Sequence, residues 1–477
     1  MIVVVDEATG KTIAKNTFWL FGGQITGRLL RAAIVIYAAR VLGAASWGAF
    51  SYALSLAAFL TIFSDFGING LLTREGVKSP ELRNKYLATA LVIKILLLLA
   101  LIIGVLLLAD NLTNLEGAAV LLPIIAFVFA FDSLRDLGTA MARALEKMHI
   151  EAGVNIFTNL AITVLGFVFL NSSKTASSLA WAYAIGTGLG FLAIVYILRE
   201  YFRGFAKNFD KNLVKTIITS AWPFGLLGLM GVVMINTDIL MLGWLTSAEE
   251  TGFYSAAQKP IQLLYVLPML IAAAFFPALT RLAKQESEGF RNVFERGLTT
   301  IYLMAAPLAV GGVILSKHIV LLLYGQPYLP AVSSFAILAA TILVVFPATL
   351  IANGIFAHDK QKNLLGYVAL GVFGNVFFNF LFIPLWGMEG AALSTFINQI
   401  IINIYLWRQF KRTRNFSILP HLKKIFLAAA IMGAVTLGLQ YYNTNVLLNV
   451  LISGALYITI LTLLKEPTIR LFKSLIH

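Results

Sequence analysis

Long, uninterrupted apolar blocks constrain this chain more than any other feature of its sequence. The block at residues 86–109, YLATALVIKILLLLALIIGVLLLA, contains a single charged residue. As a helix, such a block is long enough to cross the hydrocarbon core of a bilayer, which is roughly 30 Å thick. Lipid offers no hydrogen bonds to the backbone, so blocks of this kind cross as helices rather than as open strands. The sequence therefore predicts an all-α membrane protein.

The composition supports this class and narrows the chemistry. Of the 477 residues, 59% are hydrophobic and 12% are charged, whereas about 25% charged residues is usual for a soluble domain. The chain has no Cys, and its five His residues lack the spacing of metal ligands. We therefore expect no catalytic residue, no metal and no cofactor.

The apolar blocks predict fourteen transmembrane helices, and this even number places both termini on the same side of the membrane. The predicted helices span residues 17–41, 47–69, 86–109, 117–139, 150–170, 177–198, 217–241, 252–278, 297–316, 331–356, 363–385, 388–407, 425–442 and 446–464.

The distribution of Lys and Arg gives an independent check, because cytoplasmic loops are enriched in both residues. With the N-terminus inside, 28 of the 36 Lys and Arg lie in inside segments, and only Arg40, Lys174 and Lys317 lie in outside loops. This asymmetry also explains the net charge of +14, so no nucleic-acid partner is expected. We predict a multi-pass protein of the cell (inner or plasma) membrane with both termini in the cytoplasm.

The longest polar stretch follows the sixth predicted helix and divides the chain. We predict an N-terminal six-helix bundle at residues 1–198, a cytoplasmic linker at 199–216 and a C-terminal six-helix bundle at 217–407. Residues 408–477 then hold a basic loop and helices 13 and 14.

A weak internal repeat coincides with this division. Residues 48–53, GAFSYA, align without gaps with residues 252–257, GFYSAA. Six helices per repeat is an even number, so the two halves have the same orientation. We expect an axis along the membrane normal to relate them, as in transporters that rock two bundles about a central site.

Three stretches resemble the polysaccharide biosynthesis family of the multidrug/oligosaccharidyl-lipid/polysaccharide exporter superfamily. They are ARVLGAASWGAF at 39–50, LYGQPYLPAVSSFAILA at 323–339 and NFLFIPLWGMEGAA at 379–392. The resemblance implies two six-helix bundles in a V with two extra helices. It also implies a flippase that turns polyprenyl-pyrophosphate-linked sugars from the inner to the outer leaflet, with glycosyltransferases or a polymerase of the same pathway as further partners.

Two arginines are the sharpest candidates for substrate binding. Arg28 and Arg31 lie near the middle of the first predicted helix, where a charge is costly unless it faces a wet cavity or a partner. Their spacing puts them on one face with Gln24, and guanidinium groups bind phosphate oxygens in bidentate fashion. We expect this face to bind the substrate pyrophosphate. The alternative is structural ion pairing with Asp65 or Asp132.

Lys259, early in the eighth predicted helix, is a further candidate for pyrophosphate binding. The resemblance supports it, because basic residues of these helices line the cavity in related flippases. The alternative is that Lys259 reaches the nearby outer surface, as long basic side chains do. For Lys94, in an aliphatic run of the third helix, we expect such an extension toward the cytoplasmic surface.

Other membrane-embedded charges suggest gating or coupling. Asp132, Arg135 and Asp136 form an acid–base–acid cluster that either latches one conformation or simply neutralises itself. Asn236 and Asp238 carry the oxygen ligands that suit Na⁺ or H⁺ coupling, whereas Asp65 is expected to be structural. Gly-xxx-Gly pairs at 23–27 and 186–190, and the glycines at 225, 228 and 231, predict close helix packing.

Two other functions remain open at this level. A multidrug or cation antiporter of the same superfamily is expected to carry acidic residues in its first bundle, and the first helix here carries two arginines instead. A membrane glycosyltransferase or polymerase needs a catalytic cluster, usually in a large outside loop, and the predicted outside loops are short.

Overall fold

The computed structural model describes the whole chain except residues 1–6, 116, 284–287, 361 and 468–477. Every regular element among the described residues is helical, as the apolar blocks predict. The chain divides into two compact units, Met1–Gly252 and Phe253–His477.

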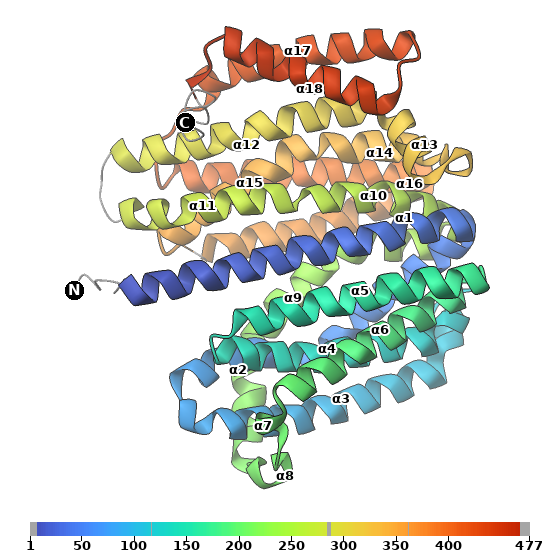
Figure 1. The fold of residues 1–477 in the computed structure, drawn as a ribbon, viewed down its shortest axis with the longest axis vertical. Helices are drawn as coiled ribbons and strands as arrows, with labels where there is room; N and C mark the ends of the chain where they lie inside the picture. Colours follow the sequence, from blue (N-terminus) through green and yellow to red (C-terminus); the bar gives the residue numbers. More distant parts are fainter. Residues whose placement is uncertain (1–6, 116, 284–287, 361, 468–477) are drawn as a thin grey trace. The chain divides into compact units, whose positions relative to one another are not determined.

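Unit 1 is a bundle in which α5 packs between α1 and α6, and α4 packs against α6 and α1 (Figure 1). The helix α9 packs against α1 and α2. The elements of unit 1 are α1 (Glu7–Asp65), α2 (Ile68–Lys78), the 3-10 turn η1 (Pro80–Leu82), α3 (Arg83–Leu112), α4 (Ala118–Ala144), α5 (Met148–Ser172), α6 (Ala176–Ile197), α7 (Arg199–Phe202), α8 (Phe205–Asn208), α9 (Lys211–Leu245) and the start of α10 (Ala248–Leu264).

Two glycine breaks shape the first helices of unit 1. The element α1 runs through the predicted turn between the first two helices, but Gly43 interrupts it with φ 74° and ψ 170°. A second break follows Asp65, where Phe66 and Gly67 both have positive φ, a conformation that glycine adopts without steric cost. The predicted second helix, 47–69, is therefore cut before its end, and α2 continues separately.

Small residues allow the helices of unit 1 to pack closely, as predicted for two of the three glycine motifs. A Cβ on Gly23 would overlap Ala152 of α5, and a Cβ on Gly186 would overlap Ile162. In the third motif, Gly225 packs against the backbone of Phe66, whereas a Cβ on Gly228 or Gly231 would meet no atom within 4 Å. Among the described residues, the first glycine of that motif alone makes a close packing contact.

The repeat-related segments of unit 1 cross each other at their glycines. A Cβ on Gly48 would overlap the backbone of Ala248, and a Cβ on Gly252 would overlap the backbone of Ala44. The numbering offset between Gly48 and Gly252 equals that between Ala44 and Ala248. The two repeat segments thus contact each other through equivalent positions, which is the pattern that two-fold symmetry produces.

Unit 2 contains α12 packed against α11, α15 and α17, and α18 packed against α17 (Figure 1). Buried Ala306, Ala428, Met432 and Tyr457 form the core between α12, α17 and α18. Besides the end of α10, its elements are α11 (Val266–Ala283), α12 (Glu288–Ile314), α13 (Ser316–Tyr324), the 3-10 turn η2 (Gln326–Tyr328), α14 (Ala331–Ala340), α15 (Ile342–Ala357), α16 (Lys362–Lys411), α17 (Leu419–Tyr441) and α18 (Val446–Leu463).

The described residues contain 12 helices long and apolar enough to cross a membrane. Two of them, Phe18–Asp65 and Lys362–Lys411, are 48 and 50 residues long, more than twice the length that one crossing needs. The first contains the break at Gly43, and the second is interrupted at Trp386 and Gly387.

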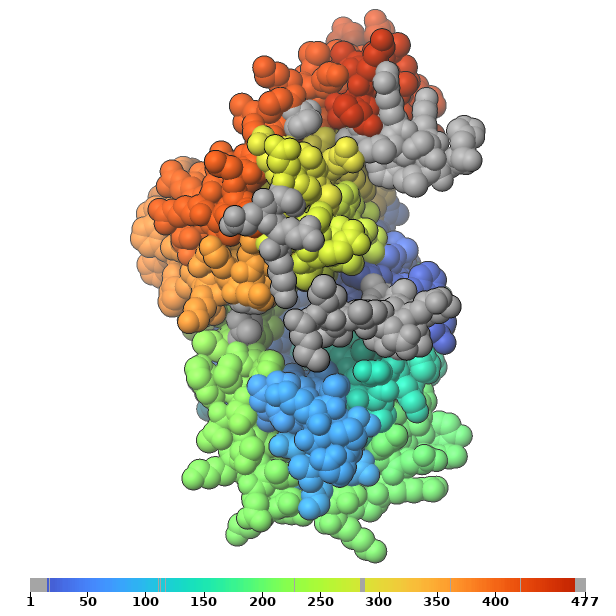
Figure 2. All heavy atoms as spheres, turned by 90° about the vertical axis from the view of Figure 1, so that its left-hand side faces the viewer, coloured from blue at the N-terminus to red at the C-terminus, as the bar shows by residue number. Residues whose placement is uncertain are grey.

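Aromatic side chains close one end of unit 2. Phe290, Phe294, Phe410 and Phe416 contact one another through their rings. Figure 2 shows the start of α12 in yellow, the α15–α16 turn in orange and the segment before α17 in orange-red at this end. The cluster holds the connection from α16 to α17 against the bundle.

Candidate functional site

The three predicted pyrophosphate-binding residues of the first helix lie on one uninterrupted stretch of α1. The backbone is helical from Glu7 to the break at Gly43, so Gln24, Arg28 and Arg31 follow one another at helical spacings of four and three residues. Residues with these spacings are neighbours on one helix face. The shared face is therefore a property of the structure as well as of the sequence pattern.

Arg31 is fixed in place by two neighbouring helices. Its Nε donates to Oδ1 of Asn159 on α5 at 2.8 Å. Its guanidinium carbon lies 5.9 Å from the ring centroid of Tyr183 on α6, within the range of a cation–π interaction. A guanidinium has five N–H donors, and among the described residues only the one on Nε is engaged. The N–H groups on the two terminal nitrogens of Arg31 are therefore available to another partner.

A row of polar side chains on α5 supports this arrangement. Asn159 donates through Nδ2 to the backbone oxygen and Oδ1 of Asn155, both at 2.8 Å. One turn further along, the Thr163 hydroxyl lies 2.7 Å from the Asn159 carbonyl oxygen of its own helix and 3.0 Å from the Leu30 carbonyl oxygen of α1, so its single proton is shared between them. The Asn159 amide is thus held from one side, so its Oδ1 has a defined direction toward Arg31.

Arg28 and Gln24 are half-buried on α1. Within the part of the chain that the structure describes, neither side chain forms a hydrogen bond or an ion pair. Gly27, between them, packs against Asn155 and Asn159, so α1 approaches α5 closely on the adjoining face. Arg28 is thus a half-buried cation to which no described carboxylate comes within ion-pair distance.

The acidic cluster on α4 is held together by ion pairs between its own members. Arg135 contacts Asp132 at 2.7 Å and Asp136 at 3.0 Å. Asp132 also interacts electrostatically with Arg31, but no ion pair within 4 Å joins them among the described residues. The alternative of ion pairing with Asp132 or Asp65 is therefore not realised for Arg31, because both carboxylates have closer basic partners.

The position of the Lys94 side chain contradicts the predicted extension toward the cytoplasmic surface. Its side chain is fully buried, and Nζ lies 2.9 Å from Oδ1 of Asp65 and 2.9 Å from Oδ1 of Asn69. These two residues stand on either side of the break at Phe66 and Gly67. The prediction is wrong because the break turns the side chains of Asp65 and Asn69 toward α3. Lys94 therefore forms an ion pair inside the bundle and does not extend to the surface. Asp65 thereby has the structural partner that was expected of it.

The remaining predicted residues lie elsewhere in the chain. Lys259 is half-buried on α10 in unit 2, with Gln258 buried beside it. Asn236 is half-buried on α9 and donates to the Val232 carbonyl oxygen of its own helix at 2.9 Å, and Asp238 is 4% exposed. Two residues apart on a helix, Asn236 and Asp238 point to different sides of α9. Their roles, and that of Lys259, stay predictions.

Sequence reasoning missed Asn155, Asn159 and Tyr183, which complete the surroundings of Arg31. A signal existed, since the two asparagines lie one turn apart within a predicted membrane helix. Polar side chains in such helices commonly form hydrogen bonds to neighbouring helices. Nothing in the sequence, however, indicated which helix they contact.

Together these residues form a cationic face of α1. Two guanidinium groups share one side of α1, one of them oriented by α5 and α6, and neither is neutralised by a carboxylate at ion-pair distance among the described residues. Arginine forks match the geometry of phosphate oxygens and can bind them through paired hydrogen bonds. The arrangement suits the binding of a phosphate or diphosphate.

Comparison with known proteins places this chain in a family. The family model described as "Polysaccharide biosynthesis protein" matches residues 13–283. A probable low-salt glycan biosynthesis flippase, Agl15, of Haloferax volcanii is 21% identical over 98% of this chain and 99% of that protein. A putative O-antigen transporter of Shigella flexneri is 23% identical over 85% of this chain and 99% of that protein.

Solved structures share the fold. The lipid II flippase MurJ in an inward closed conformation aligns with 94% of this chain and 99% of its own, with a TM-score of 0.78 and 19% identity. An inward-facing MATE family transporter of the MOP superfamily covers 82% of this chain and 96% of its own, with a TM-score of 0.66 and 15% identity. The family match extends over more than half of the sequence. This chain is therefore a multi-pass membrane protein that belongs to the polysaccharide biosynthesis protein family.

Proposed function

We propose that this protein is a flippase that moves a polyprenyl-pyrophosphate-linked oligosaccharide from the inner to the outer leaflet for surface polysaccharide biosynthesis. One observation carries the proposal: Arg28 and Arg31 share a face of α1 and keep guanidinium donors for an external anion. The headgroup of a lipid-linked sugar is a diphosphate, whose oxygens are the natural partners of such forks. The names of the relatives, a glycan flippase and an O-antigen transporter, support this substrate class.

Alternating access is the mechanism that we infer. A cavity open to the cytoplasm takes the headgroup onto Arg28 and Arg31, with Gln24 and Lys259 as further ligands, while the polyprenyl tail stays in lipid or along α17 and α18. Rocking of two bundles then exposes the headgroup outside. A membrane potential that is negative inside favours this movement by roughly 2.3 kcal/mol per charge at 100 mV.

The organisation behind this mechanism is also a proposal. Fourteen crossings, with bundles at 1–198 and 217–407 and both termini in the cytoplasm, follow if Phe18–Asp65 and Lys362–Lys411 each cross twice. Their lengths and internal breaks support that assignment. The reciprocal contact of Gly48 and Gly252 supports symmetry-related halves. Coupling to Na⁺ or H⁺ at Asn236 and Asp238, and gating by Asp132, Arg135 and Asp136, remain part of the proposal.

A cation antiporter is the second candidate, because MATE transporters share the fold. Two cations on α1 oppose the binding of organic cations, so we rank this function below the first. Proteoliposomes that contain the purified protein separate the two. We expect protein-dependent flipping of a fluorescent short-chain polyprenyl-diphosphate sugar and no uptake of ethidium under an imposed Na⁺ or pH gradient. Ethidium transport without lipid flipping would overturn the proposal.

A further inference from the structure

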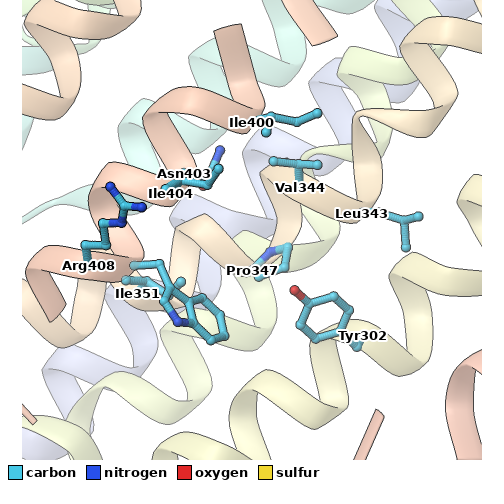
Figure 3. A pocket seen from close by; sticks show the side chains of 10 residues that line it. Tyr302, Leu343, Val344, Pro347, Ile351, Ile400, Asn403, Ile404 and Arg408 are labelled. Carbon is cyan, nitrogen blue, oxygen red and sulfur yellow. The ribbon is translucent and has the colours of Figure 1, made fainter. Parts of the chain in front are cut away.

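Unit 2 contains a groove that no part of the proposed flipping cycle uses. It has a volume of about 380 Å³ and lies between α12, α15 and the last turns of α16 (Figure 3). This volume falls within the range of about 300–1,000 Å³ that is usual for small-molecule sites. The groove is open rather than enclosed, so a ligand can enter it from the side.

The walls of the groove are aliphatic along most of their length. Leu343 and Ile351 of α15 face Ile400 and Ile404 of α16 across it, with Pro347 between the first two (Figure 3). The two residues of α15 are eight positions apart, which corresponds to roughly 12 Å along a helix. A surface of this length and composition fits a hydrocarbon chain that lies along the helices.

One end of the groove carries a cation. Arg408 lines it next to Trp407, in the last turns of α16. Arg408 is exposed, and the described part of the chain offers it no carboxylate at ion-pair distance. Trp407 packs its ring against Phe416, with the centroids 4.8 Å apart, which fixes the wall beside the guanidinium. Charge and apolar surface are therefore arranged end to end, as they are in an anionic lipid.

We propose that this groove binds an anionic phospholipid of the surrounding membrane, with one acyl chain between α15 and α16 and the phosphate on Arg408. In the predicted topology Arg408 lies at the cytoplasmic surface, where anionic lipid headgroups are attracted to basic pockets between helices. Trp407 stands at the same depth, and tryptophan is enriched at the membrane–water interface. A soluble phosphate would leave the aliphatic walls unused, and a zwitterionic lipid would gain less from Arg408.

This site is distinct from the cationic face of α1, which carries Arg28 and Arg31. It lies in another unit, on different helices, and it holds a lipid that stays in its leaflet rather than one that is transported. The two proposals can therefore fail separately, because lipid binding to the groove is measured without any flipping substrate.

Native mass spectrometry of the purified full-length protein tests the proposal, with dioleoyl phosphatidylglycerol, dioleoyl phosphatidylcholine and glycerol phosphate as probes. We expect phosphatidylglycerol to be retained in preference to phosphatidylcholine, and glycerol phosphate not to bind. Polyprenyl phosphate is included as a competitor. Its displacement of phosphatidylglycerol from the groove at equal concentration would show that the carrier lipid occupies the site and would overturn the proposal.

Two variants address the two ends of the groove. Arg408→Gln removes the cation and should lower phosphatidylglycerol affinity about tenfold while leaving phosphatidylcholine binding unchanged. Ile351→Trp fills the aliphatic part and should weaken both lipids. Arg412→Gln is the matched control, because Arg412 is an exposed cation just beyond the same helix and does not line the groove.

Folding of each variant is checked by circular dichroism and by a single peak in size exclusion. Equal phosphatidylglycerol binding by Arg408→Gln and the unsubstituted protein would contradict the proposal. An equal loss in Arg412→Gln would contradict it as well, since the effect would then come from surface charge in general.

Discussion

Gly48 and Gly252 occupy equivalent positions of the internal repeat and face each other at one helix crossing. Neither position has room for a Cβ, because the backbones of Ala248 and Ala44 stand in the way. In the proposed topology this crossing lies at the outer ends of the helices. We therefore expect it to form when the outer side is closed and to separate when the headgroup is released.

Substitution at this crossing should shift the conformational balance. Gly48→Val introduces a side chain where the Ala248 carbonyl stands, so we expect the closed crossing to be lost and flipping to fall at least tenfold. The chain has no Cys, so single cysteines can report on accessibility from outside. Labelling of a cysteine at position 44 should rise in Gly48→Val. Gly104→Val is the control, because nothing lies within 4 Å of its Cβ position, and it should leave labelling unchanged.

Lys94 should matter for stability, because it is a fully buried cation paired with Asp65. Removal of Lys94 leaves the Asp65 carboxylate, which is 31% exposed, without its partner, so the cost should lie at the lower end of the about 3–5 kcal/mol typical of fully buried pairs. Lys94→Met should therefore lower the thermal midpoint strongly, and the double variant Lys94→Met/Asp65→Asn should recover part of the loss. Lys174→Met, at an exposed lysine, should have no effect. A stable Lys94→Met protein would show that the pair is dispensable.

Asn159 should act on transport through Arg31. Its Oδ1 accepts the Nε hydrogen bond that orients the guanidinium, and a hydrogen bond to a charged group contributes about 1.5–3 kcal/mol. We expect Asn159→Ala to weaken substrate binding about tenfold or more without changing the thermal midpoint by an equal measure. Binding can be measured with a fluorescent lipid-diphosphate sugar. Thr163→Val, which removes a neighbouring bond to the α1 backbone, should affect binding less. A larger loss of substrate binding in Thr163→Val than in Asn159→Ala would contradict the role given to Asn159.

His358, beyond the end of α15, should make stability depend on pH. Burial, with smaller contributions from Arg414 and Lys360, lowers the pKa of His358 below its ordinary value of about 6.5. Its Nε2 accepts a hydrogen bond from Arg414 Nε at 3.1 Å, which requires the neutral ring. The unfolded chain takes up the proton first on acidification, so stability is complete above about pH 6.5 and falls as the pH drops toward the lowered pKa.

Thermal midpoints measured from pH 8 to pH 5 test this dependence. We expect a decline below about pH 6.5 in the unsubstituted protein and a flatter profile in His358→Asn, which cannot titrate. The Gly354 carbonyl and Asp359 favour the protonated ring and raise the pKa of His358. Burial lowers this pKa by more, so the net change is a lowering. If the thermal midpoints of the two proteins fall equally with pH, a group other than His358 causes the pH dependence.

The features that were predicted correctly from the sequence are those that the local spacing of residues determines. The shared face of Gln24, Arg28 and Arg31 follows from spacing within one helix, and the structure keeps that helix unbroken. The partner of Lys94 could not be predicted, because Asp65 is 29 residues away and faces it only through the break at Phe66. Such breaks are hard to read from apolar runs. The predicted helix at 252–278, for example, is divided at Tyr265 into α10 and α11.

The neighbours of Arg31 were missed for a related reason. Asn159 and Tyr183 belong to helices that contact α1 only in the folded bundle, and helix order in the sequence does not determine which faces meet. The acidic cluster of Asp132 and Arg135 was identified, because its members are three residues apart. That Arg135 pairs with both Asp132 and Asp136 became visible only from the distances.

Binding of a polyprenyl-diphosphate sugar to the double variant Arg28→Gln/Arg31→Gln tests the central claim most directly. The measurement compares the dissociation constant of this variant with those of the unsubstituted protein and of Arg203→Gln, which removes an exposed arginine elsewhere in unit 1. Each lost guanidinium–phosphate contact should weaken binding about tenfold or more, so we predict a loss of at least about a hundredfold in the double variant and none in the control. Equal affinity in all three proteins would contradict the assignment of the diphosphate to α1.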